Sequence, residues 1–171
     1  VAADAYPSKP VRIIVAFGPG GTSDIVARVM AQQLSEQFGR QFIVENRVGA
    51  GGTIAHAFVA KSAPDGYTLL LSDTGFSTAS GLYKSLPYDP VRDFAPISQM
   101  VRGPLAMVVP PALKASTLKE FIALAQANSG KLNYGAAGVG SPTHLAAELF
   151  NRAAKVNIAQ VQYKGSGDVT A

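Results

Sequence analysis

The chain has 171 residues and a formal net charge of +4, and 47% of its residues are hydrophobic while 15% are charged. This composition predicts a folded protein with a sizeable core and excludes a disordered chain. The absence of cysteine excludes disulfides, thiol catalysis and cysteine-based metal sites.

Simple sequence features argue against several further classes of protein. Basic residues are scattered rather than clustered with aromatic ones, so we predict no nucleic-acid partner. The two histidines, His56 and His144, lie far apart without ligand-like neighbours, which argues against a metal site. No apolar run approaches the roughly 18 residues that a membrane span needs. The start of the chain, VAADAYPSKP, indicates an exported protein whose signal peptide has been removed.

The first predicted elements are a strand, a glycine-rich loop and a helix. Val11–Phe17 is almost entirely apolar and β-branched, which is typical of a parallel strand buried on both faces. Apolar residues at helical spacing predict a helix over Ser23–Phe38 that ends at Gly39. The loop between them, GPGGTSD at 18–24, places unpaired backbone N–H groups at a helix N-terminus, where anions are stabilised.

The same alternation of strands and helices continues along the chain. Further strands are predicted at Phe42–Glu45, Tyr67–Leu71, Ile97–Val101, Leu105–Val109, Leu132–Gly135 and Ile158–Tyr163. Helices are predicted at Thr53–Ser62, at Ser77–Leu86, at Thr117–Asn128 with a capping box, and after the N-cap Ser141. A last loop covers Lys164–Asp168. The pattern predicts an α/β fold with parallel sheets, in which ligands bind beyond the carboxyl ends of the strands.

Four loops rich in glycine, serine and threonine follow predicted strands: Gly18–Asp24, Asn46–Thr53, Ser72–Thr78 and Ala136–Thr143. Backbone N–H groups and hydroxyls in front of helix N-termini suit a carboxylate ligand. The natural hydroxyl donors are Thr22, Ser72, Thr74, Ser141 and Thr143. Asp24 either caps the first helical turn or has a functional role, in which it orients the amides of Gly20–Ser23 or accepts from a ligand ammonium or hydroxyl. His144 either lies on a helix surface or donates to a carboxylate.

Two other functions compete with carboxylate binding. Gly18 and Gly20 occupy the first and third positions of a dinucleotide-binding GxGxxG motif, with Ser23 in the last position and Glu45 where a ribose-binding acid is expected. The segment GFSTA around Ser77 is similar to a nucleophile elbow, for which His56 or His144 could serve as the base of a Ser–His hydrolase.

Six segments in this order resemble the Bug, or TctC-type, extracytoplasmic solute receptors: YPSKPVRIIVAFGPGGTSDIVAR, VENRVGAGGTIA, PDGYTLL, LPYDPVRDFAPIS, LNYGAAGVGSPTHLAAELF and VQYKGSG. These receptors are the periplasmic binding proteins of tripartite tricarboxylate transporters. The resemblance implies a two-lobed α/β protein of the Venus-flytrap type, without enzymatic activity or cofactor. It also implies a small carboxylate ligand, such as a dicarboxylate, an acidic amino acid or an aromatic acid, and membrane subunits of the transporter as partners.

The resemblance also implies how the site and the lobes are placed. Residues 1–101 would form lobe one and residues 102–171 lobe two. Family members are longer, so lobe two is expected to be incomplete here and the return segment to lobe one to be missing. The ligand-binding residues that we expect lie on the first loop, the third loop and the loop of lobe two: Phe17, Gly20, Gly21, Thr22, Ser23 and Asp24; Ser72 and Thr74; Gly138, Ser141, Thr143 and His144.

Overall fold

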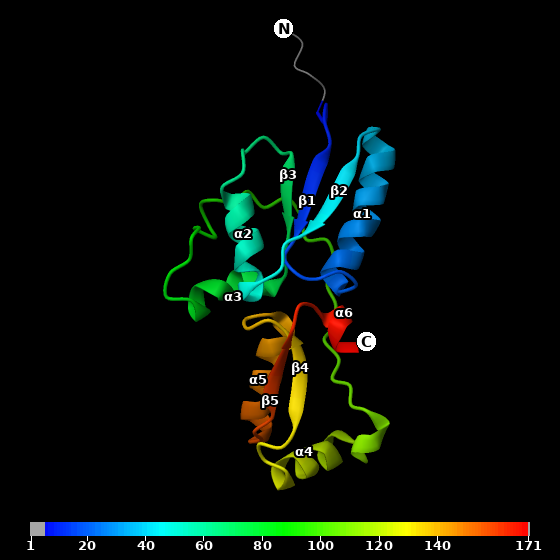
Figure 1. The fold of residues 1–171 in the computed structure, drawn as a ribbon, viewed down its shortest axis with the longest axis vertical. Helices are drawn as coiled ribbons and strands as arrows, with labels where there is room; N and C mark the ends of the chain where they lie inside the picture. Colours follow the sequence, from blue (N-terminus) through cyan, green and yellow to red (C-terminus); the bar gives the residue numbers. More distant parts are fainter. Residues whose placement is uncertain (1–5, 171) are drawn as a thin grey trace.

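Two parallel sheets form the framework of the computed structural model, which describes residues 6–170 (Figure 1). The first sheet has the order β2-β1-β3, and the second sheet pairs β4 with β5. The strands are β1 (Val11–Val15), β2 (Phe42–Asn46), β3 (Thr68–Leu71), β4 (Asn133–Ala137) and β5 (Ala159–Tyr163). Residues 1–5, which carry most of the predicted export signature, lie outside the described residues.

Helices connect the strands and cover the sheets. They are α1 (Thr22–Phe38), α2 (Thr53–Ala60), α3 (Thr74–Leu82), α4 (Leu118–Ala127), α5 (Pro142–Ala154) and α6 (Ser166–Thr170). Two short 3₁₀ turns, η1 (Ala50–Gly52) and η2 (Pro111–Leu113), complete the element order. The α/β class with parallel strands, predicted from the sequence, is confirmed.

The central strand β1 is buried on both faces, as its almost entirely apolar sequence predicts. On one face Val11, Ile13 and Val15 pack with the α1 residues Ala27 and Ala31. On the other face Ile14 packs with Ala55 of α2. Helix α1 therefore meets the sheet through alanines, which let the helix backbone approach closely. Larger apolar residues of α1 are exposed, among them Ile25 and Val29.

The second sheet has its own core, formed by Phe121 and Ala125 of α4 together with Ile158 and the half-buried Phe150. Helix α4 begins at the predicted cap, because the Thr117 hydroxyl accepts a hydrogen bond from the Glu120 N–H at 3.2 Å. The Glu120 carboxylate accepts from the N–H of Ser116, one residue before the N-cap. The predicted capping box is therefore present, but the hydrogen bond to the Glu120 carboxylate comes from the residue before the N-cap rather than from the N-cap itself.

The two strands predicted at Ile97–Val101 and Leu105–Val109 are wrong, because residues 95–110 contain no strand. A strand needs a hydrogen-bonding neighbour, and none of the described strands pairs with this segment. Its apolar side chains are exposed, Ile97 to 82% and Val108 to 77%. The segment belongs to the connection between the two sheets, where the lobe boundary after residue 101 stays a prediction.

Two helices also differ from the sequence prediction. Helix α3 starts at Thr74, three residues earlier than expected, because the Asp73 side chain caps it by accepting from the Gly75 N–H at 2.8 Å. Residues 164–168, predicted as a loop, lead into the short helix α6.

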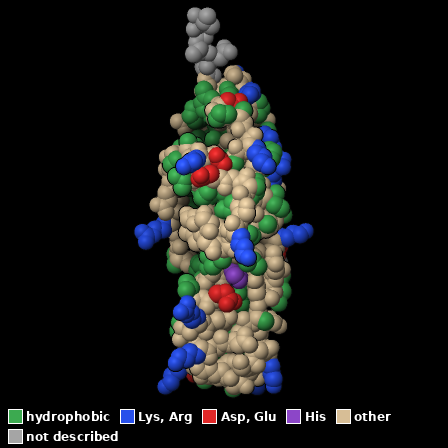
Figure 2. All heavy atoms as spheres, turned by 90° about the vertical axis from the view of Figure 1, so that its left-hand side faces the viewer, with side chains coloured by type: hydrophobic (Ala, Val, Ile, Leu, Met, Phe, Trp, Pro, Cys, Tyr) green, Lys and Arg blue, Asp and Glu red, His purple; other side chains and the backbone are tan. Residues whose placement is uncertain are grey.

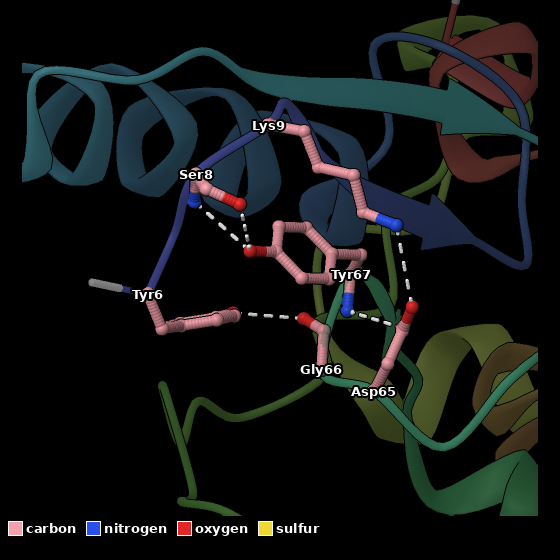
Figure 3. Close-up of polar contacts among 6 residues, drawn as sticks. All are labelled: Tyr6, Ser8, Lys9, Asp65, Gly66 and Tyr67. Atoms are coloured by element: carbon pink, nitrogen blue, oxygen red, sulfur yellow. Dashed lines mark hydrogen bonds and ion pairs between the residues drawn. The ribbon is translucent and has the colours of Figure 1, made fainter. Parts of the chain in front are cut away.

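Two of the segments that carry the family resemblance meet at the amino end of the first sheet (Figure 3). The Tyr6 hydroxyl donates to the carbonyl oxygen of Gly66 at 2.8 Å, and the Ser8 N–H donates to the Tyr67 hydroxyl at 2.9 Å. The Lys9 ammonium lies 4.3 Å from the centre of the Tyr67 ring. These contacts hold the chain that enters β1 beside β3, at the opposite end of the sheet from the loops predicted to bind ligand.

Candidate functional site

The carboxyl ends of the two sheets face each other in the middle of the elongated molecule (Figure 1), where they border a cleft of about 920 Å³. The lining comes from the ends of β1, β2, β4 and β5 and from α6: Phe17, Val48, Gly49, Ala50, Gly51, Gly52, Gly138, Gln162, Tyr163, Lys164 and Asp168. The cleft thus lies where ligands bind in open parallel sheets. Of the residues predicted from the sequence, Phe17 and Gly138 line it.

The first loop is shaped by Asp24, whose side chain is buried at the start of α1. Its carboxylate accepts from the Gly20 N–H at 3.0 Å, from Arg28 Nε at 2.9 Å and from Asn46 Nδ2 at 2.9 Å. The hydrogen bond from Arg28 is the main reason that the pKa of Asp24 falls to about 2. Asp24 is therefore ionised and orients a loop amide, one of the two roles that the sequence left open.

A segment of the second half of the chain covers the first loop. The Gly18 N–H donates to the Lys164 carbonyl oxygen at 3.1 Å. A Cβ atom added at Gly167 would lie 3.0 Å from the carbonyl carbon of Gly20, so the two backbones touch. The sequence predicts that the N–H groups of Gly18 and Gly20 are available to an anion. In the structure both of them donate hydrogen bonds within the chain. Thr22 is exposed and Ser23 is half-buried beside them.

The loop after β2 forms a large part of the cleft wall, although we did not include it among the expected ligand-binding residues. Gly49, Ala50, Gly51 and Gly52 have φ angles of 132°, 46°, 62° and 98°. Three of these four positions are glycine, which adopts such angles without steric cost. A Cβ atom at Gly51 would lie 2.1 Å from the carbonyl oxygen of Val139, so the loop touches the β4–α5 turn directly. The glycine-rich sequence NRVGAGG is the feature of the sequence that could have identified this loop as part of the cleft wall.

The third loop begins with Ser72, whose hydroxyl oxygen lies 2.8 Å from His56 Nε2. The other ring nitrogen of His56, Nδ1, lies 3.0 Å from the Tyr88 hydroxyl. The His56 side chain is 1% exposed, and this burial lowers its pKa from 6.5 to about 4. His56 is therefore neutral at pH 7. Thr74, the other predicted donor of this loop, is exposed at the start of α3.

The predicted residues of the β4–α5 turn are engaged with one another. Ser141 is fully buried; its hydroxyl donates to the Ala137 carbonyl oxygen and accepts from the His144 N–H. The Thr143 hydroxyl accepts from the Ala137 N–H at 3.3 Å, and His144 Nδ1 accepts from the Gly140 N–H at 3.2 Å. Ser141 is the predicted N-cap of α5. These three side chains build the turn that carries Gly138 into the cleft wall.

The geometry does not support the two competing functions. The Glu45 carboxylate, the expected ribose-binding acid, is paired with Arg12 and with Arg47, the latter at 2.7 Å. Ser77 lies exposed within α3, and neither His56 nor His144 contacts it among the described hydrogen bonds.

The described residues also bear on metals, membranes and surface charge. Within residues 6–170, no group of three His, Cys, Asp or Glu side chains could hold a metal ion. No helix in this part of the chain has the length and apolar character of a membrane span. Lysine and arginine side chains are dispersed over the face in Figure 2 rather than gathered in one patch.

Comparisons with known proteins agree with the fold. The chain is 43% identical over 169 residues to Protein BugT of Bordetella pertussis, covering 98% of this chain and 52% of BugT. It is similar to the structure of R. palustris Rpa4515 with adipate, with a TM-score of 0.92 and 37% identity over 96% of this chain and 56% of that one. MatC from Rhodopseudomonas palustris with bound malate matches the same shares of both chains, with a TM-score of 0.91 and 32% identity.

The chain spans about half the length of the curated relatives it matches. Residues 26–170 match the family described as the tripartite tricarboxylate transporter family receptor, TctC. Members of this family are periplasmic solute-binding receptors. From the matched residues, the parallel sheets and the cleft between their carboxyl ends, we conclude that the chain belongs to the TctC family of tripartite tricarboxylate transporter receptors.

Proposed function

We propose that this chain is part of a periplasmic receptor that captures a small carboxylate in the cleft and presents it to the membrane subunits of a tripartite tricarboxylate transporter. The convergence of both sheets' carboxyl ends on one cleft carries this proposal. The N-termini of α1, α2 and α5 follow β1, β2 and β4, which end at the cleft, so their dipoles favour a negatively charged ligand. Rpa4515 and MatC, solved with adipate and malate, support a carboxylate as the ligand.

The cleft offers two kinds of group to a carboxylate. The loop Gly49–Gly52 supplies backbone N–H groups, except that of Gly52, which donates to the Gly49 carbonyl oxygen, and Lys164 is a basic residue of the same lining. Phe17 and Gly138 also line the cleft, Phe17 with an apolar side chain. Thr22, Ser23, Ser72 and Thr74 lie outside the cleft lining, and in this proposal their hydroxyls reach the ligand from the first and third loops. In this proposal Gly20, Gly21, Asp24, Ser141, Thr143 and His144 support the site by shaping its loops.

The proposed mechanism is capture by hinge closure, without a chemical step. A ligand that contacts both sheets binds more tightly when they are close together, and this difference in affinity drives the closed state. The close approach of Gly51 to Val139, where an added Cβ atom would lie 2.1 Å from the carbonyl oxygen, supports this closed arrangement. The closed form would then present the surface that the membrane subunits recognise.

Isothermal titration calorimetry of the full-length receptor tests the proposal. We expect binding of at least one acid from a panel of adipate, malate, glutamate and benzoate, and no binding of NAD. Lys164→Gln is expected to weaken that binding roughly two- to tenfold. Lys131→Gln, which changes an exposed lysine outside the cleft lining, is the matched control. Binding of NAD without any acid would favour the dinucleotide alternative and overturn the proposal.

A further inference from the structure

We propose that His56 is a positioning residue for ligand binding, which fixes the hydroxyl of Ser72 as a hydrogen-bond donor toward a carboxylate in the cleft. His56 lies on α2, and Ser72 directly follows β3. The two side chains meet at 2.8 Å between Nε2 and Oγ. The inference rests on the proposed function, because it assigns Ser72 to the ligand carboxylate.

His56 belongs to an aromatic cluster in which His56 and Tyr88 are buried and Phe76 and Phe94 are half-buried. Its ring lies edge-on to Phe76, with centroids 5.0 Å apart, and edge-on to Tyr88, with centroids 5.6 Å apart. Phe94 packs edge-on against both Phe76 and Tyr88. This apolar surrounding keeps the imidazole neutral, because the charged form would lose its hydration. A neutral imidazole has one ring hydrogen, so one nitrogen donates and the other accepts.

Tyr88 decides which nitrogen of His56 carries the hydrogen. The Tyr88 hydroxyl lies 3.0 Å from His56 Nδ1, its single hydrogen-bond partner within the described part of the chain. Tyr88 is 7% exposed, and its burial raises the pKa of the phenol, so the hydroxyl hydrogen is present and requires an acceptor. Nδ1 is that acceptor. The ring hydrogen therefore lies on Nε2, which donates to Ser72 Oγ.

This direction of hydrogen bonding determines what Ser72 offers to a ligand. Because its oxygen accepts from His56, its own hydrogen is free to donate, and His56 is its single side-chain partner among residues 6–170. A donor suits a carboxylate, whereas the opposite tautomer would turn lone pairs toward it. The imidazole also lies directly behind the cleft wall, since a Cβ atom at Gly52 would lie 3.1 Å from His56 Cε1.

A double-mutant cycle on the full-length receptor tests the inference, with the tightest-binding acid among adipate, malate, glutamate and benzoate as the probe. Ser72→Ala and His56→Leu are each expected to raise the dissociation constant about tenfold, as for a lost hydrogen bond to a charged group. Adding His56→Leu to Ser72→Ala is expected to cause no further loss, because His56 acts through Ser72. His56→Gln, whose amide N–H replaces Nε2–H, should restore affinity to within a few-fold.

Tyr134→Phe is the control, since it removes a hydroxyl that donates to Glu148 outside the cleft lining. Nitrogen NMR of the wild-type imidazole adds a readout that needs no variant to fold, and we expect the Nε2-protonated tautomer. An Nδ1-protonated tautomer, or additive losses in the double variant, overturns the inference. Normal carboxylate binding by the His56→Leu variant overturns this inference but leaves the proposed function in place. A wild-type receptor that binds none of the acids overturns the proposed function and this inference with it.

Discussion

Gly51→Ala perturbs the contact between the two sheets at one defined point. A Cβ atom at this position would lie 2.1 Å from the carbonyl oxygen of Val139, whereas ordinary contacts lie at 3.4–4 Å. The η1 loop and the β4–α5 turn would have to separate by on the order of 1 Å, and such overpacking typically costs about 1–3 kcal/mol. Because the cost falls on the arrangement in which the sheets touch, we expect the dissociation constant for a carboxylate to rise roughly 5- to 150-fold.

Gly39→Ala is the matched control for this experiment. Gly51 and Gly39 have nearly the same left-handed φ, 62° and 64°, so alanine carries the same conformational cost of about 1 kcal/mol at both. A Cβ atom at Gly39 has nothing within 4 Å. Both variants should therefore lose about 1 kcal/mol of unfolding free energy to backbone conformation, and Gly51→Ala should lose up to a further ~1–3 kcal/mol to overpacking, whereas Gly51→Ala alone weakens binding. Calorimetric titration and urea unfolding of the full-length receptor measure the two quantities. Unchanged affinity in Gly51→Ala would refute the role of this contact in closure.

Three further predictions concern stability and can be measured by urea unfolding. Burial lowers the pKa of His56 from 6.5 to about 4, so the unfolded state binds the proton first as the pH falls. The free energy of unfolding should therefore drop by up to about 3 kcal/mol between pH 6.5 and pH 4. His56→Gln should reduce this pH dependence, and an equal pH dependence in both proteins would contradict the burial of a neutral His56. Asp24→Asn should cost about 1–3 kcal/mol because it weakens the bonds from Gly20 and Arg28, with the exposed Glu36→Gln of the same helix expected to stay within about 0.5 kcal/mol. Ala50→Gly should stabilise the protein by roughly 0.5–1 kcal/mol, because Ala50 has a φ of 46°; a loss of stability would show that its methyl group packs usefully.

The sequence alone predicts those features that depend on residues close together in the chain. The almost entirely apolar sequence of β1 predicts a strand covered on both faces, and Ile14 and Val15 are fully buried. Gly39 ends α1 in the left-handed conformation, and Ser141 caps α5, as their residue types predict. Patterning failed at Ile97–Val109, because an apolar, β-branched segment forms a strand only beside a hydrogen-bonding partner.

The order of the glycine-rich loops after the strands indicated a carboxylate cleft and its family, but the sequence alone could not say which loops line that cleft. Distances between residues far apart in the chain decided this. The Lys164 carbonyl oxygen accepts a hydrogen bond from the Gly18 N–H, and the Asp24 carboxylate accepts one from the Gly20 N–H. The loop after β2 lines the cleft in place of these groups. The bond between Ser72 and His56 likewise joins separate elements. Residue types determine which groups can bind a carboxylate, whereas tertiary packing determines which of them remain available to do so.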